Sequence, residues 1–548
     1  MNRLFRYASS IAILVATALV SDVQACTNLI VGKKASKDGS VIVSYSADSY
    51  GAFGSLAFQP AAKHKAGDMR ALYDYETNNY LGSIPEVPET YQVVGLMNEF
   101  QLTIHETTFG GREELVDTTG IMDYGSLMYV TLQRAKTARE AIDVMTSLVE
   151  EYGYRSEGES FSIADPNEVW IMEMIGKGPG RKGANWVAVR IPDDCISGHA
   201  NQSRIRQFPL KDKANCLYSK DIIKFAREKG FFSGKDADFS FSEAFSPADF
   251  GALRYCEARV WSYFNRWADL DMSQFLDYAK GENPNNPMPL YVRPKAPLDV
   301  QDVKDMMRDH YEGTPLDILH DLGMGPYEMP YRPSPLSFEA DGKKYFNERP
   351  ISTQQSSDVY VSQMRSWLPN YIGGLVWYGN DDANMIPLTP LYCCLQQVPD
   401  CYSSKLADCF HFSFRNAYWV QNWVSNMIYY RYRDLFPELK AVRDRLENDY
   451  RSLGADIEAK AKEMPKDKAI RMLSDYSIRQ AQGMLDEWNQ LGQMLIVKYN
   501  DMVMKDVDEN GQYKRTPGGV QTAVKRPGYP ETFRRKMVQE TGDRYLLK

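Results

Sequence analysis

Cys26 is the residue whose position in the chain most strongly suggests chemistry, because it directly follows a leader-like stretch that ends in Ala25. Cleavage after Ala25 would make Cys26 the first residue of the mature protein. Its α-amino group, with a pKa of about 7.7–8.0, can accept a proton near neutral pH, and its thiol has an ordinary pKa of about 8.5. The nucleophile and its general base then belong to the same residue, which predicts an N-terminal cysteine nucleophile.

Residues 1–25 have the pattern of a secretory signal peptide. Arg3 and Arg6 form a basic start, residues 11–20 form an apolar run, and small or β-branched residues precede Cys26. The apolar run is shorter than the roughly 20 residues that a spanning helix needs, and no later segment reaches that length. We therefore expect an exported protein, periplasmic or extracellular, with no membrane span.

A cysteine after a leader can also carry a lipid, so a lipid-anchored binding protein without catalysis is one alternative. Gln24 is unusual in a lipidation sequence, and no polar tether follows Cys26. Instead, residues 27–32 and 40–46 are predicted to be strands joined through an Asp38-Gly39 turn. A chain that enters a sheet at once buries its first residue, which favours catalysis over anchoring.

The composition is that of a folded globular protein, with 548 residues, 43% hydrophobic and 25% charged, and a net charge of −8. Lys and Arg are scattered, so no nucleic-acid partner is expected. No metalloprotease helix, phosphate-binding loop or serine-hydrolase elbow is present. We expect neither a metal nor another cofactor, because the six histidines lack metal-ligand spacing. They are His64, His105, His199, His310, His320 and His411.

Seven further cysteines lack the paired spacing of a zinc site. In an exported protein some of them are expected to pair as disulfides, with at least one left over, and the sequence does not show which ones pair. They are Cys195, Cys216, Cys256, Cys393, Cys394, Cys401 and Cys409.

Periodicity predicts an α+β fold. Thr137 and Glu140 have the spacing of a capping box, and a helix with an apolar face is predicted to run from there to Gly153. Strands are predicted at residues 160–164, 169–174 and 186–191. Strands that flank a helical block in this way suit two stacked antiparallel sheets covered by helices.

Three parts of the chain are expected: a signal peptide (1–25), a catalytic core (26–300) and a C-terminal part that completes the fold (301–548). A Pro-rich stretch at residues 283–297 is the candidate boundary or surface excursion. A helical hairpin is predicted at about 437–500, and we expect it to pack on the core. Whether the protein forms a homo-oligomer is left open.

The sequence resembles the dipeptidase A-type cysteine peptidases of the N-terminal-nucleophile (Ntn) hydrolase superfamily, and more distantly bile salt hydrolases and penicillin V acylases. The resemblance implies a four-layer αββα sandwich, here with additional C-terminal helices. It rests on motifs spread over most of the mature chain: Cys26-Thr27-Asn28, Asp38-Gly39-Ser40, Trp170 to Glu173, Ala200-Asn201, Ser203-Arg204-Ile205, Arg254-Tyr255, Arg259-Val260-Trp261, Gln363-Met364-Arg365 and Ile372-Gly373-Gly374.

The resemblance implies roles for Asp48, Asn98 and Asn201. Asp48 would orient the amine of Cys26. The alternative is that Asp48 is a solvated loop residue without a catalytic role. Asn201 would hold the oxyanion, and Asn98 is the second candidate for that role. Alternatively, Asn201 only forms a local Asx turn, and Asn98 is only a residue at the tip of a turn. The acylase relatives carry an Arg three residues before the Asp, and Tyr45 stands there in this chain.

The resemblance also places one arginine at the catalytic centre, and Arg259 is the first choice. Arg204 and Arg254 are the candidates for binding a substrate carboxylate. Alternatively, Arg254 and Arg259 lie on the exposed face of a helix and have no role in the site. The expected activity is hydrolysis of dipeptides through a thioester on Cys26, with small peptides as substrates; the nearer alternative is an amidase acting on N-acyl amides such as conjugated bile salts.

Overall fold

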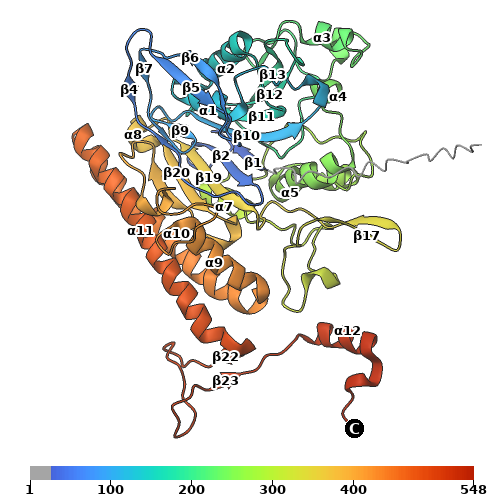
Figure 1. Cartoon of the computed structure of the whole chain (residues 1–548), viewed down its shortest axis with the longest axis vertical. Helices are drawn as coiled ribbons and strands as arrows, with labels where there is room; N and C mark the ends of the chain where they lie inside the picture. Colours follow the sequence, from blue (N-terminus) through green and yellow to red (C-terminus); the bar gives the residue numbers. More distant parts are fainter. Residues whose placement is uncertain (1–25) are drawn as a thin grey trace, which may run out of the picture.

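The computed structural model, described here for residues 26–548, is built on two large antiparallel sheets with helices on their outer sides (Figure 1). The first sheet has seven strands, in the order β16 (Tyr291–Val292), β14 (Ile196–His199), β1 (Asn28–Val31), β2 (Val41–Asp48), β19 (Ser356–Met364), β20 (Leu375–Asn380) and β21 (Thr389–Tyr392). The second has eight, in the order β15 (Cys216–Tyr218), β13 (Ala184–Ile191), β12 (Val169–Gly176), β11 (Gly158–Ala164), β10 (Thr103–Gly110), β9 (Met97–Asn98), β8 (Val93–Val94) and β3 (Phe58–Gln59).

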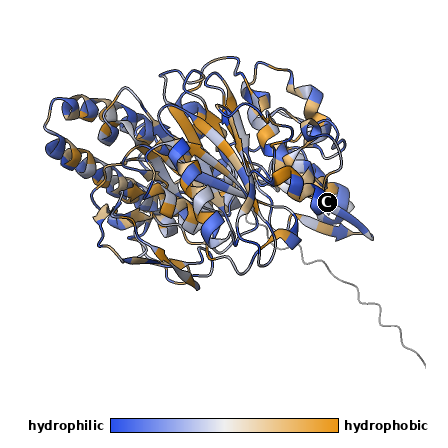
Figure 2. Ribbon diagram, turned by 90° about the horizontal axis from the view of Figure 1, so that it is seen from above, coloured by the Kyte–Doolittle hydropathy of each residue, from blue (hydrophilic) through white to orange (hydrophobic). Residues whose placement is uncertain are grey.

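The two sheets contact each other where β1 and β2 meet β10 and β11. The central strands are therefore covered on both faces, and every residue of β1, β11 and β12 is buried. Figure 2 shows the consequence, since the strands in the middle of the molecule are largely apolar. The mixture of helices with antiparallel sheets confirms the predicted α+β class.

Helices cover the outer face of each sheet. α1 (Tyr124–Leu132) and α2 (Ala138–Tyr152) contact the eight-stranded sheet, whereas α5 (Ala258–Trp267), α7 (Val300–Met306) and α9 (Ala417–Tyr430) contact the seven-stranded sheet. The shorter helices are α3 (Ile222–Glu228), α4 (Phe241–Phe245), α6 (Leu276–Ala279) and α8 (Asn370–Gly373). A π-helical segment, η3 (Ala252–Glu257), leads directly into α5.

Local sequence accounts well for α2. The Thr137 side chain accepts the hydrogen bond from the Glu140 backbone N–H, and Gly153, with φ +78°, ends the helix. The capping box itself is incomplete, because the Glu140 carboxylate accepts from the backbone N–H of Lys136 and not from that of Thr137. One half of the predicted motif is thus present.

The C-terminal half of the chain supplies central parts of the same sheet. β19 pairs with β2 over the whole length of β2, so residues beyond 300 lie directly beside the strand that follows Cys26. The Pro-rich stretch at residues 283–297 contributes β16, which pairs with β14 at the sheet edge. It is therefore an edge strand and its flanking turns, not a break between separate units.

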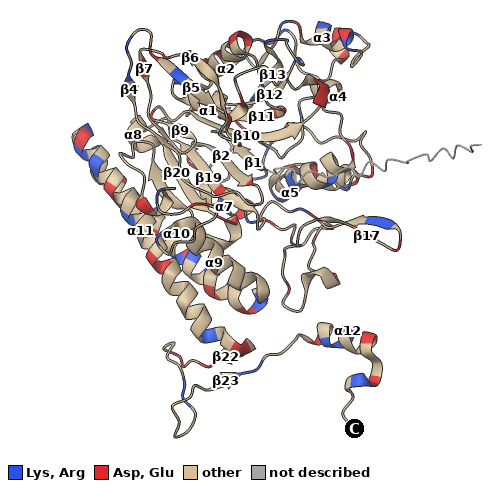
Figure 3. Ribbon diagram, in the orientation of Figure 1, with Lys and Arg blue, Asp and Glu red and all other residues tan. Residues whose placement is uncertain are grey.

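Two long helices, α10 (Tyr432–Lys462) and α11 (Lys466–Tyr499), pack against each other and against β21. Beyond them, β22 (Met504–Lys505), β23 (Val524–Lys525) and α12 (Glu531–Thr541) extend away from the sheets (Figure 1). Charged residues are frequent on α10, α11 and α12, whereas the central strands carry few (Figure 3). Among residues 26–548, no helix is long and apolar enough to cross a membrane.

Small two-stranded pairs complete the described structure. They are β4 (Ala62–Lys63) with β7 (Glu89–Thr90), β5 (Met69–Tyr73) with β6 (Tyr80–Pro85), β17 (Ser337–Ala340) with β18 (Lys343–Phe346), and β22 with β23.

Candidate active site

Cys26 lies where the chain enters the seven-stranded sheet, facing the second sheet. The next residue, Thr27, forms an antiparallel bridge with Ser46 of β2, with backbone N···O distances of 3.3 and 3.0 Å. This bridge fixes the position of Cys26, whose side chain is buried with 4% exposure. The apolar, β-branched residues of β1 and β2 thus hold the candidate nucleophile between the sheets.

The Cys26 thiol is next to a phenol and a carboxyl group. Its Sγ lies 3.7 Å from Tyr45 Oη and 3.8 Å from Glu106 Oε1, and Tyr45 Oη donates a hydrogen bond of 2.7 Å to the same oxygen. Burial, and then the carboxylates of Glu106 and Asp48, raise the pKa of the Cys26 thiol well above its usual value. The resting sulfur is therefore a thiol, and a base has to remove its proton before it can attack.

Neither buried histidine near the sheets fills the role of that base. His105 Nε2 bonds with the hydroxyls of Thr103 (3.0 Å) and Ser362 (3.2 Å). His199 bonds with hydroxyls through both of its ring nitrogens. Burial lowers the pKa of each imidazole to about 3, so both are neutral at physiological pH. They connect strands within the core, and no His hydrogen-bonds the Cys26 thiol within residues 26–548.

Asp48 lies beside Cys26 at the end of β2. Its backbone N–H hydrogen-bonds with the thiol and thereby favours the thiolate. Its carboxylate, 1% exposed as a residue, accepts hydrogen bonds from Ser46 Oγ (3.0 Å), Ser356 Oγ (2.6 Å) and Arg349 Nη2 (2.5 Å). These partners fix its orientation, and the carboxylate is close enough to influence any charge on Cys26.

Arg259 connects Cys26 to Asn201. Its Nη1 donates to the Cys26 carbonyl (2.6 Å) and to Thr27 Oγ1 (2.7 Å), while Nη2 donates to the Ala200 carbonyl (3.1 Å) and to Asn201 Oδ1 (3.0 Å). Its Nε donates to the Tyr255 carbonyl, at 2.8 Å. Burial lowers the pKa of this guanidinium to about 10, which leaves it charged. Arg259 thus positions the backbone of the candidate nucleophile.

Asn201 is held in an orientation that only a few residue types adopt. Its φ is +60°, in the left-handed region that Asn tolerates better than most residues. Its Oδ1 accepts from Arg259, and its Nδ2 donates to the Thr108 carbonyl at 2.8 Å. The amide group is thus fixed two residues away from strand β14 and is linked to Cys26 through a single guanidinium.

Asn98 is placed in a different environment. Its Nδ2 donates to the carbonyls of Leu132 and Ala135, both at 2.8 Å, and its Oδ1 accepts from the backbone N–H groups of Phe100 and Leu102. Both amide hydrogens are therefore used to join the β9–β10 turn to the end of α1. The structure gives Asn98 the role of a turn residue and leaves no N–H for an oxyanion.

Arg204 and Arg254 are also committed to protein partners. Arg204 pairs with Glu257 at 2.9 Å, its side chain is 2% exposed, and its remaining donors bond the carbonyls of Gly198, Pro289 and Leu290. Arg254, on the π-helical segment η3, pairs with Glu348. The structure does not bring either guanidinium to the Cys26 thiol, and the Arg204 pair is a buried structural contact.

Replacing Arg204 with Met is expected to lower the free energy of unfolding by about 3 kcal/mol, because it leaves the Glu257 carboxylate buried without its partner. A fall in Tm would measure the effect, and the double variant Arg204→Met/Glu257→Gln should recover part of it. An unchanged Tm combined with a higher KM for dipeptides would instead assign Arg204 to substrate binding.

Three residues beside Cys26 and Asp48 were not identified as site residues from sequence: Tyr45, Glu106 and Arg349. A fourth, Glu159, lies on β11 beside β10. A signal was present in β10, whose sequence TIHETTFG is largely polar although it lies in the core. Consecutive polar side chains on a buried strand need partners in the interior on both faces of the sheet, and they mark a site more often than a surface.

The expectation of disulfides is not met, since all eight cysteines of residues 26–548 are free thiols. No group of three or more His, Cys, Asp or Glu able to hold a metal ion was found in that range.

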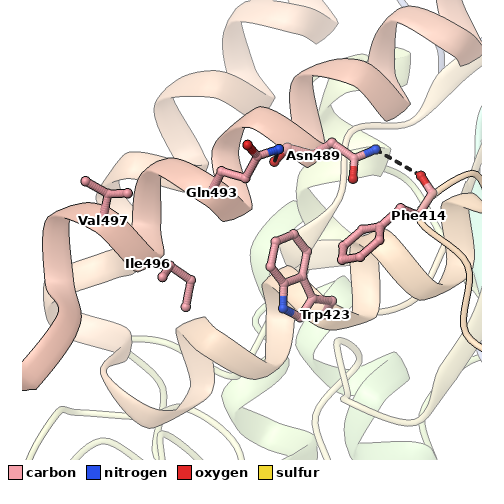
Figure 4. Close-up of a pocket in the computed structure, with 6 residues that line it drawn as sticks. All are labelled: Phe414, Trp423, Asn489, Gln493, Ile496 and Val497. Atoms are coloured by element: carbon pink, nitrogen blue, oxygen red, sulfur yellow. Dashed lines mark hydrogen bonds between the residues drawn. The ribbon is translucent and has the colours of Figure 1, made fainter.

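A surface pocket of about 610 Å³ lies between α9 and α11 (Figure 4). The pocket has no titratable side chain in its lining and therefore offers no acid, base or nucleophile. Its lining residues are Phe414, Trp423, Asn489, Gln493, Ile496 and Val497.

Comparison with known proteins assigns the chain to a peptidase family. Residues 25–445 match the sequence profile of Peptidase family C69. The chain is 28% identical to a "Probable dipeptidase" of Salmonella dublin, covering 67% of this chain and 81% of the relative. It is 25% identical both to a "Probable dipeptidase" of Latilactobacillus sakei (73% and 80%) and to a "Dipeptidase" of Bifidobacterium longum (67% and 71%). Because the profile covers most of the chain, this protein belongs to peptidase family C69 and is a cysteine-type peptidase.

Proposed function

We propose that this protein is an exported dipeptidase that hydrolyses dipeptides through a thioester on Cys26, the first residue of its mature form. The observation that carries the proposal is the place of Cys26. The residue that follows the leader-like stretch is buried between the sheets, its carbonyl is held by Arg259, and no histidine of residues 26–548 hydrogen-bonds its thiol. The printed names of the relatives favour dipeptides over other amides.

In the proposed mechanism, the free α-amine of Cys26 takes the thiol proton, and the thiolate attacks the carbonyl carbon of the substrate. Asp48 stabilises the resulting ammonium group. Asn201 contributes a hydrogen bond to the oxyanion of the tetrahedral intermediate. The ammonium then protonates the leaving amine as the peptide C–N bond breaks, and water resolves the thioester to release the first amino acid.

We further infer that the two sheets and their outer helices form the four-layer αββα sandwich of Ntn hydrolases. The order helix, sheet, sheet, helix and the position of Cys26 at the start of a central strand support this assignment. The proposed export is supported by the sequence pattern of residues 1–25, which lie outside the described residues.

Asn201→Ala is expected to lower kcat by roughly 100- to 1,000-fold with a smaller change in KM, because the amide acts on charge that develops only in the transition state. Steady-state kinetics with a dipeptide measures the effect. Asn185→Ala is the matched control, since Asn185 is a buried amide that bonds the Gly176 carbonyl away from Cys26. Equal kinetic losses in the two variants would remove Asn201 from the mechanism.

The function is tested on protein processed in a cell that exports it. Intact mass and N-terminal sequencing should give an unmodified terminus at Cys26, and the product should cleave dipeptides faster than N-acyl amino acids. Preference for N-acyl amides would establish the amidase alternative. A diacylglyceryl mass on Cys26 with no hydrolysis would establish the lipid-anchored alternative and overturn the proposal.

A further inference from the structure

We propose that Glu106 and Glu159 form the subsite that binds the α-ammonium group of the substrate, so that the enzyme requires a free N-terminus; this assignment rests on the proposed function. Both carboxyl groups are buried beside the nucleophile, and nothing in the mechanism above employs them. The inference follows from their placement, their lack of a cationic partner and the dimensions of a peptide.

The strand register places the two glutamates side by side. Thr108 of β10 pairs with Glu159 of β11, and Glu106 lies two residues before Thr108, on the same face of the sheet. Thr108 Oγ1 donates to Glu159 Oε1 at 2.7 Å, while Glu106 Oε1 accepts from Tyr45 Oη and lies 3.8 Å from Cys26 Sγ. Glu106 therefore lies next to the sulfur, and Glu159 lies beside Glu106 on the same face of the eight-stranded sheet.

Each carboxyl group has one oxygen that no N–H or hydroxyl group of the protein reaches. Glu106 is 3% exposed and Glu159 0%, and within residues 26–548 their Oε2 atoms accept from no such donor, so the only further hydrogen bond of the pair is the one between the two carboxyl groups. A buried carboxylate oxygen without a donor is strongly disfavoured unless a ligand supplies one. An ammonium group has three N–H donors and can bond both carboxyl groups at once.

The charge of the pair also calls for a cation. Burial is the largest cause of the raised pKa of both carboxyls, and the proximity of Glu106 further raises that of Glu159. No Lys or Arg is among the main influences on either group. Two carboxyl groups this close can share a proton, and the pair carries a negative charge in the core whenever fewer than two protons are bound. A single bound ammonium neutralises that charge.

The dimensions of a peptide indicate that the cation bound by the two glutamates is the α-ammonium group of the substrate. The nitrogen of the first residue lies about 2.5 Å from the carbonyl carbon that follows it, given standard bond lengths. That carbon approaches the attacking sulfur to about 3–3.5 Å. The ammonium is therefore within about 6 Å of Sγ, the region that the Glu106 carboxyl occupies. Cleavage is thus directed to the first peptide bond.

Binding is tested first, without turnover. In a mature chain carrying Cys26→Ala, calorimetry with alanyl-alanine is expected to show a roughly 10- to 100-fold weaker Kd when Glu159→Gln or Glu106→Gln is added, as for loss of a charged hydrogen bond. N-acetyl-alanyl-alanine should bind weakly to all of these proteins. Glu157→Gln is the control, because Glu157 is an exposed carboxylate just before β11. Equal Kd values for alanyl-alanine with and without Glu159→Gln overturn the assignment.

Kinetics of the chain with Cys26 intact gives a second readout. The preference for alanyl-alanine over its N-acetyl form, as a ratio of kcat/KM, should fall at least about 10-fold in Glu159→Gln. KM for alanyl-alanine should rise as the pH falls and the pair takes up its second proton. If Glu159→Gln changes kcat for both substrates equally, the pair serves the thiol or the Cys26 amine and not the substrate. If the unmodified enzyme cleaves no dipeptide, the proposed function itself has failed.

Discussion

Replacing Cys26 with Ala is expected to reduce kcat/KM for dipeptides by at least about 10⁴-fold and to leave the fold unchanged. The loss should be this large because the sulfur forms the covalent bond to the substrate, so no remaining group can complete the same path. The fold should survive because Ala fits the space of a buried side chain whose nearest partners are 3.7 and 3.8 Å away.

Steady-state kinetics and thermal unfolding on the same protein measure the two parts of this prediction. Cys216→Ala is the matched control: it removes a buried thiol from β15, and burial raises the pKa of that thiol to about 12. Normal activity in Cys216→Ala and none in Cys26→Ala is the expected result. Substantial dipeptide hydrolysis by Cys26→Ala would show that another group is the nucleophile.

A chain that keeps one additional residue before Cys26 is expected to be inactive, with kcat reduced about 10³-fold or more. The extension converts the α-amine into an amide, which cannot accept a proton near neutral pH, and removal of a catalytic base has effects of this size. The base is indispensable here because burial and two carboxylates keep the Cys26 sulfur protonated.

The measurement compares the extended chain before and after removal of the extra residue by a specific protease. Activity should appear together with the free terminus, as followed by intact mass. The extended chain should also react more slowly with iodoacetamide, which reports on thiolate formation independently of any substrate. Full activity of the extended chain would mean that another group takes the thiol proton, and Glu106 is the carboxyl group that hydrogen-bonds with the thiol.

The sequence alone was sufficient for features that depend on neighbouring residues. The α+β class, the limits of α2 and the strands after Cys26 follow from hydrophobic periodicity and from caps such as Thr137 and Gly153. Cys26 was identified as the candidate nucleophile because the chemistry of an N-terminal cysteine is contained within one residue. Asp48 and Arg259 were singled out by resemblance, and the structure brings both of them to Cys26.

The partners of each polar side chain were decided only by the tertiary structure. Asn98 and Arg204 have the residue types that an oxyanion site and a carboxylate site need, but their donors are satisfied by α1 and by Glu257. Glu106 and Glu159 lie 53 positions apart in sequence and meet only because β10 and β11 pair in one register. Periodicity specifies which face of an element is buried, whereas hydrogen bonds and ion pairs depend on contacts between distant segments, and these exist only once the two sheets have packed together.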